Sequence, residues 1–254
     1  MAKIAPYLAQ NLADDNLKIA LGVYPGVASV NKYGRNRAVT SGGAEEISSL
    51  SAAAVRPATA LMTTISQTTD QVASRGKTVR VIGLDANFDV VNQTALLNAT
   101  DTTTKVTLGT ALQRVNSFSM ESSVAIDSTV RLHNTAENQD YAIILVGDDE
   151  AHQAFYTVPS GKTAYMTNYW AIKNLGGGEP TDLDILLKVV NNASPYIVHT
   201  VDGFGLDPDG GIDFKREFKP YKAFVAQSDI ILEAVTVGAA ADVSGGFDLI
   251  LVDN

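Results

Sequence analysis

The feature that most constrains the fold is an alternation of apolar and polar residues, with a period of two, that runs from Gly76 to the end of the chain. Residues 78–82, a turn at 83–87 and residues 88–97 predict one β-hairpin. Similar runs recur roughly every 8–12 residues, rich in Thr, Val, Ile, Tyr and Phe and separated by turn-forming residues. No amphipathic helix long enough for a parallel crossover lies between them. The pattern therefore predicts an all-β fold, an antiparallel β-sandwich of jelly-roll type.

The predicted β-sandwich body, residues 76–254, is long enough to contain two units. Residues 75–78 read Arg-Gly-Lys-Thr and open one strand, and residues 160–163 read Ser-Gly-Lys-Thr and open another. Each could begin one of two stacked β units, with halves at residues 76–150 and 151–254. The alternative is that Gly-Lys-Thr is a common entry into a strand. A chain of 254 residues accommodates one large domain or two small ones.

Residues 1–75 differ from the rest of the chain. Residues 8–20 carry leucines at roughly helical spacing, enough for a short amphipathic helix, and glycines such as Gly34 then interrupt any long element. Residues 48–74 are mostly Ala, Ser and Thr, which bury too little surface to offset the entropy of ordering. We expect residues 1–75 to form an N-terminal arm with little regular structure that orders by docking on another protein.

Charge, hydropathy and cysteine content argue against nucleic-acid partners, membrane partners and thiolate sites. Residues 1–75 carry seven Lys and Arg against five Asp and Glu, a net +2, and the remaining residues carry twelve against twenty-three, a net −11. Nucleic acid is bound by clustered Lys and Arg, so an acidic body predicts no nucleic-acid partner. No apolar run approaches the ~18–20 residues of a membrane span, so no membrane partner is expected. The absence of cysteine excludes disulfides and thiolate metal sites.

Two acidic clusters are the candidate metal sites. Asp207, Asp209 and Asp213 alternate through a glycine-rich turn, and calcium prefers such oxygen-rich loops. The distal glutamate of a helical calcium loop is missing, however, because Phe218 stands in its place. Acidic turns are ordinarily solvated, so we favour a plain turn and expect no metal. The second cluster spans residues 148–152 and is more typical of a charged linker between the two halves.

Enzymatic motifs are absent. Residues 161–163 resemble the end of a phosphate-binding loop, but a strand pattern follows where that loop requires a helix. The histidines, His133, His152 and His199, are not spaced as metal-ligand pairs. There is no Gly-x-Ser-x-Gly sequence for a serine nucleophile, and nothing selects a catalytic pair among the carboxylates. We therefore expect no catalytic residues, no cofactor and no enzymatic activity.

Several stretches of the sequence resemble structural proteins of marine tailed bacteriophages. The resemblance covers most of residues 30–254 in the same order and is carried by residues 31–36, 79–88, 94–98, 155–163 and 242–254. It implies a non-enzymatic virion component with a β-sandwich fold, assembled in the host bacterial cytoplasm. It brings no functional residue with it.

Three functions are compatible with this reading of the sequence. The first is a capsid-surface accessory subunit, either a decoration (cement) protein or a head fibre, anchored to other virion proteins through residues 1–75. The second is a tail or fibre adaptor subunit that contacts the host surface. The third, from another class, is a carbohydrate-binding β-sandwich module.

The aromatic residues of the second half predict self-association. If β-strands alternate strictly, Tyr165 and Tyr169 share one face of a strand and Trp170 lies on the other. Large aromatic side chains on the outer face of a sandwich would form an exposed apolar patch, which usually marks an interface. We expect a homo-oligomer, and a homotrimer follows from the resemblance to fibre and cement proteins. The alternative is a chain that buries both faces itself.

Overall fold

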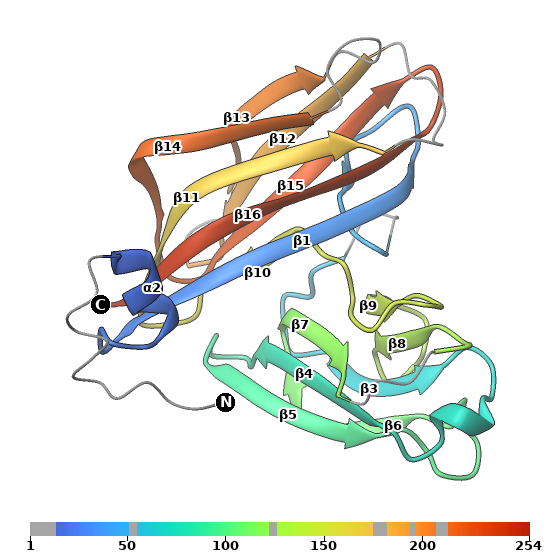
Figure 1. Ribbon diagram of the computed structural model, residues 1–254. Helices are drawn as coiled ribbons and strands as arrows, with labels where there is room; N and C mark the ends of the chain where they lie inside the picture. The colour runs from blue at the N-terminus through green and yellow to red at the C-terminus, as the bar shows by residue number, and fades with distance from the viewer. Residues whose placement is uncertain (1–13, 51–54, 122–125, 175–181, 194–196, 207–212) are drawn as a thin grey trace.

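The computed structural model describes residues 14–50, 55–121, 126–174, 182–193, 197–206 and 213–254. These residues form two β-sandwiches, a larger one built mainly from the C-terminal part of the chain and a smaller one inserted into it (Figure 1). The predicted all-β antiparallel fold is confirmed. The one α-helix among these residues, α2 (Asp15–Ala20), lies at the end of the larger sandwich, and no described helix is long and apolar enough to cross a membrane.

The larger sandwich consists of two antiparallel sheets. Sheet A contains, in spatial order, β1 (Val27–Val39), β16 (Ala241–Asp253), β11 (Lys162–Lys173) and β14 (Asp213–Phe224). Sheet B contains, in spatial order, β10 (Phe155–Thr157), β15 (Ser228–Val237), β12 (Asp182–Asn191) and β13 (Ile197–Leu206), with the short β2 (Glu45–Glu46) on β15.

The order of these strands is that of a jelly roll. When the eight main strands are counted along the chain, from β1 through β10 to β16, sheet A has the order 1-8-3-6 and sheet B has the order 2-7-4-5. Apart from β12 and β13, which are consecutive along the chain, the pairs join strands that are distant in sequence, as two nested Greek keys require. The strand order agrees with the predicted jelly-roll type, although the sequence predicted none of these strand pairs.

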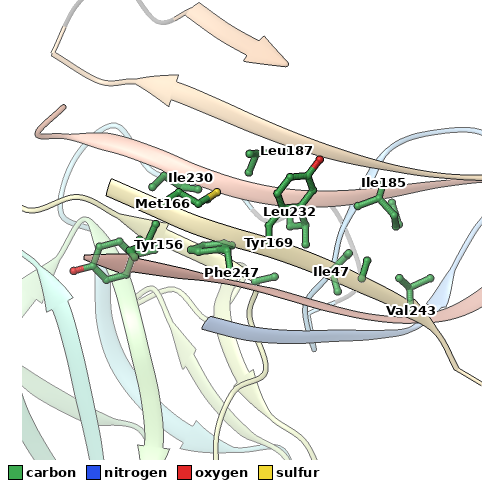
Figure 2. Close-up of a cluster of buried hydrophobic side chains, with 14 of the residues drawn as sticks. Ile47, Tyr156, Met166, Tyr169, Ile185, Leu187, Ile230, Leu232, Val243 and Phe247 are labelled. Carbon is green, nitrogen blue, oxygen red and sulfur yellow. The ribbon is translucent and has the colours of Figure 1, made fainter. Parts of the chain in front are cut away.

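The core of the jelly roll fills the space between sheets A and B. Figure 2 shows side chains from both sheets meeting there, among them Tyr169 and Phe247 from sheet A and Leu187 and Leu232 from sheet B. All four are fully buried. Complete burial of a large apolar side chain is worth about 1.5–3 kcal/mol, so this layer is the main source of the sandwich's stability.

The smaller sandwich is inserted between β1 and β10. Its four-stranded sheet has the spatial order β6 (Val106–Leu112), β3 (Met62–Gln67), β8 (Val130–His133), β9 (Asp140–Ile144). Its three-stranded sheet has the spatial order β5 (Val90–Leu96), β4 (Thr78–Leu84), β7 (Arg114–Met120), and a 3₁₀ turn covers Val72–Ser74. The pairing of β4 with β5 is the hairpin predicted from residues 78–97. This sandwich has its own core, which includes Ile65, Val81 and Phe118.

The expectation of little regular structure throughout residues 1–75 is wrong for Val27–Val39, Glu45–Glu46 and Met62–Gln67. β1 pairs with β16 from Val27↔Val252 to Val39↔Ala241 and is one of the eight main strands of the jelly roll. Gly34 is not a break in it. A Cβ at Gly34 would lie 2.0 Å from the carbonyl oxygen of Ile47, so glycine is needed where two backbones meet.

The aromatic basis of the predicted oligomer is also wrong. β11 changes register between Met166 and Asn168, in its pairing with both neighbours. This β-bulge moves Tyr169 to the inner face of sheet A, where it is fully buried, while Tyr165 stays partly exposed. The two tyrosines therefore lie on opposite faces, and the sandwich buries much of its aromatic surface within one chain.

A fragment of residues 76–254 tests the role of β1. It lacks β1, β2 and β3, which leaves β16 without one neighbour and the smaller sandwich without a central strand. We expect it to lose the near-ultraviolet circular dichroism and cooperative thermal unfolding of the full chain, whereas a fragment of residues 14–254 keeps both. A native-like spectrum and melting transition for residues 76–254 would show that β1 is dispensable.

Candidate functional site

The acidic turn considered as a metal site is only partly described. Asp207 and Asp209 lie outside the described residues, and Asp213 is the exposed first residue of β14. Across the described part of the chain, no group of three or more His, Asp or Glu side chains is arranged to hold a metal ion. The expectation of a plain turn without a metal at Asp207, Asp209 and Asp213 therefore remains untested.

The second acidic cluster connects the two sandwiches. Asp148 lies 3.4 Å from Nη2 of Arg37 on β1 and 3.7 Å from Nδ1 of His152. The ring of His152 meets Tyr33 edge-on, with centroids 4.9 Å apart. These contacts fit the linker interpretation, because each side chain joins the segment before β10 to β1.

The other residues considered as possible sites in the sequence are two histidines and the Gly-Lys-Thr motif, and their surroundings point to structural roles. His133 is fully buried in the smaller sandwich, where its ring nitrogens lie 2.9 Å from the hydroxyls of Thr64 and Ser66. His199 is exposed on β13. Residues 161–163 begin β11, a strand, so the helix that a phosphate-binding loop needs is absent there. The glycine run at residues 176–178 lies outside the described residues.

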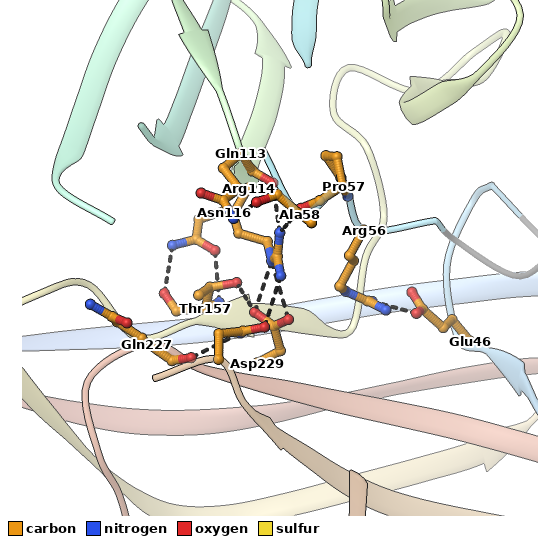
Figure 3. A network of polar contacts seen from close by, with 11 residues as sticks. Glu46, Arg56, Pro57, Ala58, Gln113, Arg114, Asn116, Thr157, Gln227 and Asp229 are labelled. Atoms are coloured by element: carbon orange, nitrogen blue, oxygen red, sulfur yellow. Dashed lines mark hydrogen bonds and ion pairs between the residues drawn. The ribbon is translucent and has the colours of Figure 1, made fainter. Parts of the chain in front are cut away.

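The best-defined polar site is the junction between the two sandwiches (Figure 3). Arg114, the first residue of β7, reaches Asp229 on β15, and its Nε lies 3.1 Å from both carboxylate oxygens. The two side chains are 2% and 0% exposed. Nη1 also donates to the carbonyl of Pro57 at 2.7 Å, and Nη2 donates to Oδ1 of Asn192 at 3.1 Å. A charge pair this deeply buried holds only when its hydrogen bonds are satisfied.

Asn116 continues the junction along β7. Its amide nitrogen donates to the carbonyl of Thr157 at 2.9 Å, and its oxygen accepts from the Thr157 backbone N–H at 2.9 Å. The side chain thereby replaces a neighbouring strand for β10, the edge strand of sheet B. The hydroxyl of Thr157 then donates to Asp229 at 2.6 Å, which joins both parts of the junction into one network.

A second buried pair lies on the segment that leaves the jelly roll. Arg56 forms an ion pair with Glu46, and its guanidinium lies 4.0 Å from the centre of the Phe155 ring. Burial raises the pKa of Glu46, and the charge of Arg56 opposes that rise. The junction therefore contains two enclosed arginine–carboxylate pairs, Arg114–Asp229 and Arg56–Glu46.

Lys32 is the third cation at the junction. Its Nζ donates to the carbonyl of Asn116 at 2.7 Å from β1. Burial lowers the pKa of Lys32 to about 8, and only the more distant charge of Glu150 opposes this change. Unlike the two arginines, Lys32 makes no ion pair with a described residue.

Sequence reasoning missed the whole junction. Arg114 and Asp229 are 115 residues apart and belong to different sandwiches. The available signal was weak: a carboxylate directly before the apolar run at residues 230–232. Such a position favours burial, but it does not identify the cation that meets the carboxylate.

The junction seals one side of the jelly roll and leaves the other open. The smaller sandwich lies beside β1 and β10, the edge strands of sheets A and B on one side, while β14 and β13 form the opposite edges (Figure 1). Within the described residues, β14 pairs only with β11 and β13 only with β12. We call β13 and β14 together the open edge.

The open edge differs in chemistry from the rest of the molecule. β14 carries four basic residues and two acidic ones, a net +2, and β13 adds one acidic residue, Asp202, in a chain whose net charge is −9. Lys215 and Lys222 are exposed and form no ion pair with any described residue. Large exposed apolar side chains accompany them at Ile197, Val198, Tyr221 and Val225. Exposed apolar side chains on such an edge favour contact with another protein, whereas the lysines oppose backbone pairing of the edge with another strand.

Comparison with known proteins finds only distant structural similarity. No protein-family model and no curated protein matches the chain. The solved T=1 particle derived from infectious bursal virus has 10% identity and a TM-score of 0.27, over 100% of this chain and 76% of that one. The VP2 subviral particle of infectious bursal disease virus has 13% identity and a TM-score of 0.21, over 90% of this chain and 72% of that one. Similarity at these TM-scores carries no argument about function.

Replacing Arg114 tests whether the junction is held by the buried ion pair. Arg114→Met leaves the carboxylate of Asp229 buried without a cation, so we expect the free energy of unfolding to fall by about 3–5 kcal/mol. Arg131→Met is the matched control. It breaks a pair with Asp140 whose side chains are 21% and 27% exposed, and it should cost about 0–1 kcal/mol. Equal losses for the two variants in urea denaturation would contradict a special role for Arg114.

The lowered pKa of Lys32 predicts how stability depends on pH. Between pH 8 and 10.5 the unfolded chain keeps the proton on Lys32 and the folded chain releases it, so stability rises with pH. We expect the wild-type unfolding free energy, measured relative to Lys32→Met, to increase by about 1–3 kcal/mol across this window. Urea denaturation of both proteins at several pH values measures the difference. A difference that stays flat would mean that Lys32 titrates as an exposed lysine.

Proposed function

We propose that the chain is a non-enzymatic structural subunit of a virus particle, and specifically a capsid-surface accessory subunit of the decoration or head-fibre kind. An eight-stranded jelly roll is an architecture used by viral capsid proteins, and the sequence resemblance to bacteriophage structural proteins supports the same class. Because a fold does not determine function, the proposal depends on the surface of this chain.

The observation that carries the proposal is the open edge. One side of the jelly roll is sealed by the junction, while β13 and β14 present free backbone groups, exposed apolar side chains and unpaired lysines. With β14 at +2, the rest of the chain carries −11, since the total is −9. The acidic surface of another copy of the same chain would therefore attract the basic strand β14, which supports self-association. A cyclic homotrimer is the arrangement we favour.

The contact with other virion proteins is assigned to the segment around α2. The three described strands before residue 76, β1, β2 and β3, all belong to the two sandwiches, so they are not free to act as an arm. α2 and its flanks differ, because the helix has no buried residue and Leu17, Leu21 and Tyr24 are exposed. These side chains give the segment an apolar surface that a capsid protein can cover.

A tail or fibre adaptor is the second candidate, and copy number separates it from the first. A decoration protein covers the shell in many copies, whereas an adaptor forms one small ring at the tail. Antibody against this chain should label particles purified from the producing culture, and a cryo-electron map should place a jelly roll with its inserted sandwich on the shell. Particles that lack the chain altogether would refute the proposal.

Self-association through the open edge is tested with charge reversal. We expect the full chain to sediment as an oligomer that dissociates with rising salt, because exposed charges are screened. Lys215→Glu combined with Lys222→Glu should give a monomer. Lys77→Glu combined with Lys105→Glu changes the net charge equally on the smaller sandwich and should leave the oligomer intact. A wild-type protein that stays monomeric at high concentration would contradict self-association.

A further inference from the structure

A groove of about 440 Å³ lies on sheet A. It crosses all four strands of the sheet, with α2 at one end and the Glu217–Tyr221 part of β14 at the other. Neither the junction nor the free backbone of the open edge accounts for this groove. Its volume is in the range of small-ligand sites, roughly 300–1,000 Å³.

The floor of the groove is a row of alternating amides and carboxylates. The strand register aligns Asn31 with Asp248, Asp248 with Asn168, and Asn168 with Glu217, one residue from each strand of sheet A. The amide nitrogen of Asn31 donates to Oδ1 of Asp248 at 2.7 Å, and that of Asn168 donates to Oδ2 at 2.8 Å. Asp248 therefore fixes the orientation of both amides, because a carboxylate only accepts.

This fixed orientation leaves hydrogen-bond acceptors without donors. Asn168 is 8% exposed, and its Oδ1 has no hydrogen-bond partner in the structure. Turning the amide over would bring that oxygen against Oδ2 of Asp248, so the side chain cannot relieve the deficit by itself. Oδ1 of Asn31 also accepts no hydrogen bond from the described residues, but Asn31 is exposed, so this oxygen is accessible to water or to a ligand. A buried acceptor without a donor is unfavourable, and a bound molecule that supplies O–H groups would satisfy it.

The walls of the groove combine apolar and polar groups. Tyr221 is 51% exposed, and together with Ile250 it supplies apolar surface beside the polar row. Lys219 lies at the same end and pairs with Glu217 at 3.0 Å, which lowers the pKa of that carboxyl and keeps it charged. A ligand here meets acceptors along the floor, apolar surface on the wall and one cationic donor.

These groups select a ligand class. Asp248 and Glu217 outnumber Lys219, so the groove disfavours phosphate and other anions. A calcium ion needs six to eight oxygen ligands, whereas both oxygens of Asp248 already accept amide hydrogens. A neutral polyol fits, because its hydroxyls donate to the amide oxygens and to Glu217, and its C–H faces pack on Tyr221. We propose that this groove binds a neutral saccharide chain.

Binding is tested on the full chain with defined probes. An array of neutral glucan, mannan, galactan and chitin oligosaccharides identifies a bound sugar, and calorimetry then measures its affinity for the wild type and variants. Asn31→Ala and Glu217→Gln should each weaken binding about tenfold or more. Asn87→Ala and Glu121→Gln are the matched controls, since both residues are exposed in the smaller sandwich, and they should leave the affinity unchanged.

Three results would overturn the saccharide site. They are an array without any bound sugar, a bound sugar whose affinity is unchanged by Asn31→Ala and Glu217→Gln, and binding of calcium chloride or inorganic phosphate in place of sugar. The variants are also compared with the wild type by circular dichroism, so that a lost fold is not taken for a lost site. Incorporation into particles is measured separately, because loss of saccharide binding would not refute the virion role, and loss of the virion role would not refute saccharide binding.

Discussion

The enclosed carboxylate of Asp229 is the constraint on which the arrangement of the two sandwiches depends. A charge removed from water needs a cation and satisfied hydrogen bonds, and here both come from the other sandwich through Arg114. Thr157, which is itself held by Asn116, completes the set. This one network holds the inserted sandwich against the jelly roll and covers the edge strand β10. The opposite edges, β13 and β14, are therefore the side available to a partner.

Much of the fold could be predicted because strands with one buried face have a visible period of two. The β4–β5 hairpin and the jelly-roll class follow from that pattern. β1 could not be predicted in the same way. Its small and polar residues pack against another backbone at Gly34, and a glycine in a close contact looks the same in a sequence as a glycine in a turn. The β-bulge before Asn168 was equally hidden, because an inserted residue reverses the faces only once the partner strands are known.

The candidate sites were less predictable than the fold. Sequence reasoning looked for local clusters, such as Asp207, Asp209 and Asp213, since neighbours along a chain are the only neighbours a sequence shows. The groove on sheet A consists instead of single residues from four strands, and Asn31 and Asp248 are 217 positions apart. An asparagine or aspartate at the outward position of a strand is common on any solvated face. Only the register that aligns them, together with the unpaired oxygen of Asn168, distinguishes this row.

The pairing of β1 with β16 also has a consequence for the kinetics of folding. These strands join residues near the two ends of the described chain, with the whole inserted sandwich between them. Contacts of such large sequence separation form late, because loop closure must come first. β1 therefore cannot complete its pairing with β16 until the residues between these two strands have been made. Its charged side chains, Lys32, Arg35 and Arg37, are of the kind that discourages an unpaired strand from pairing with other chains.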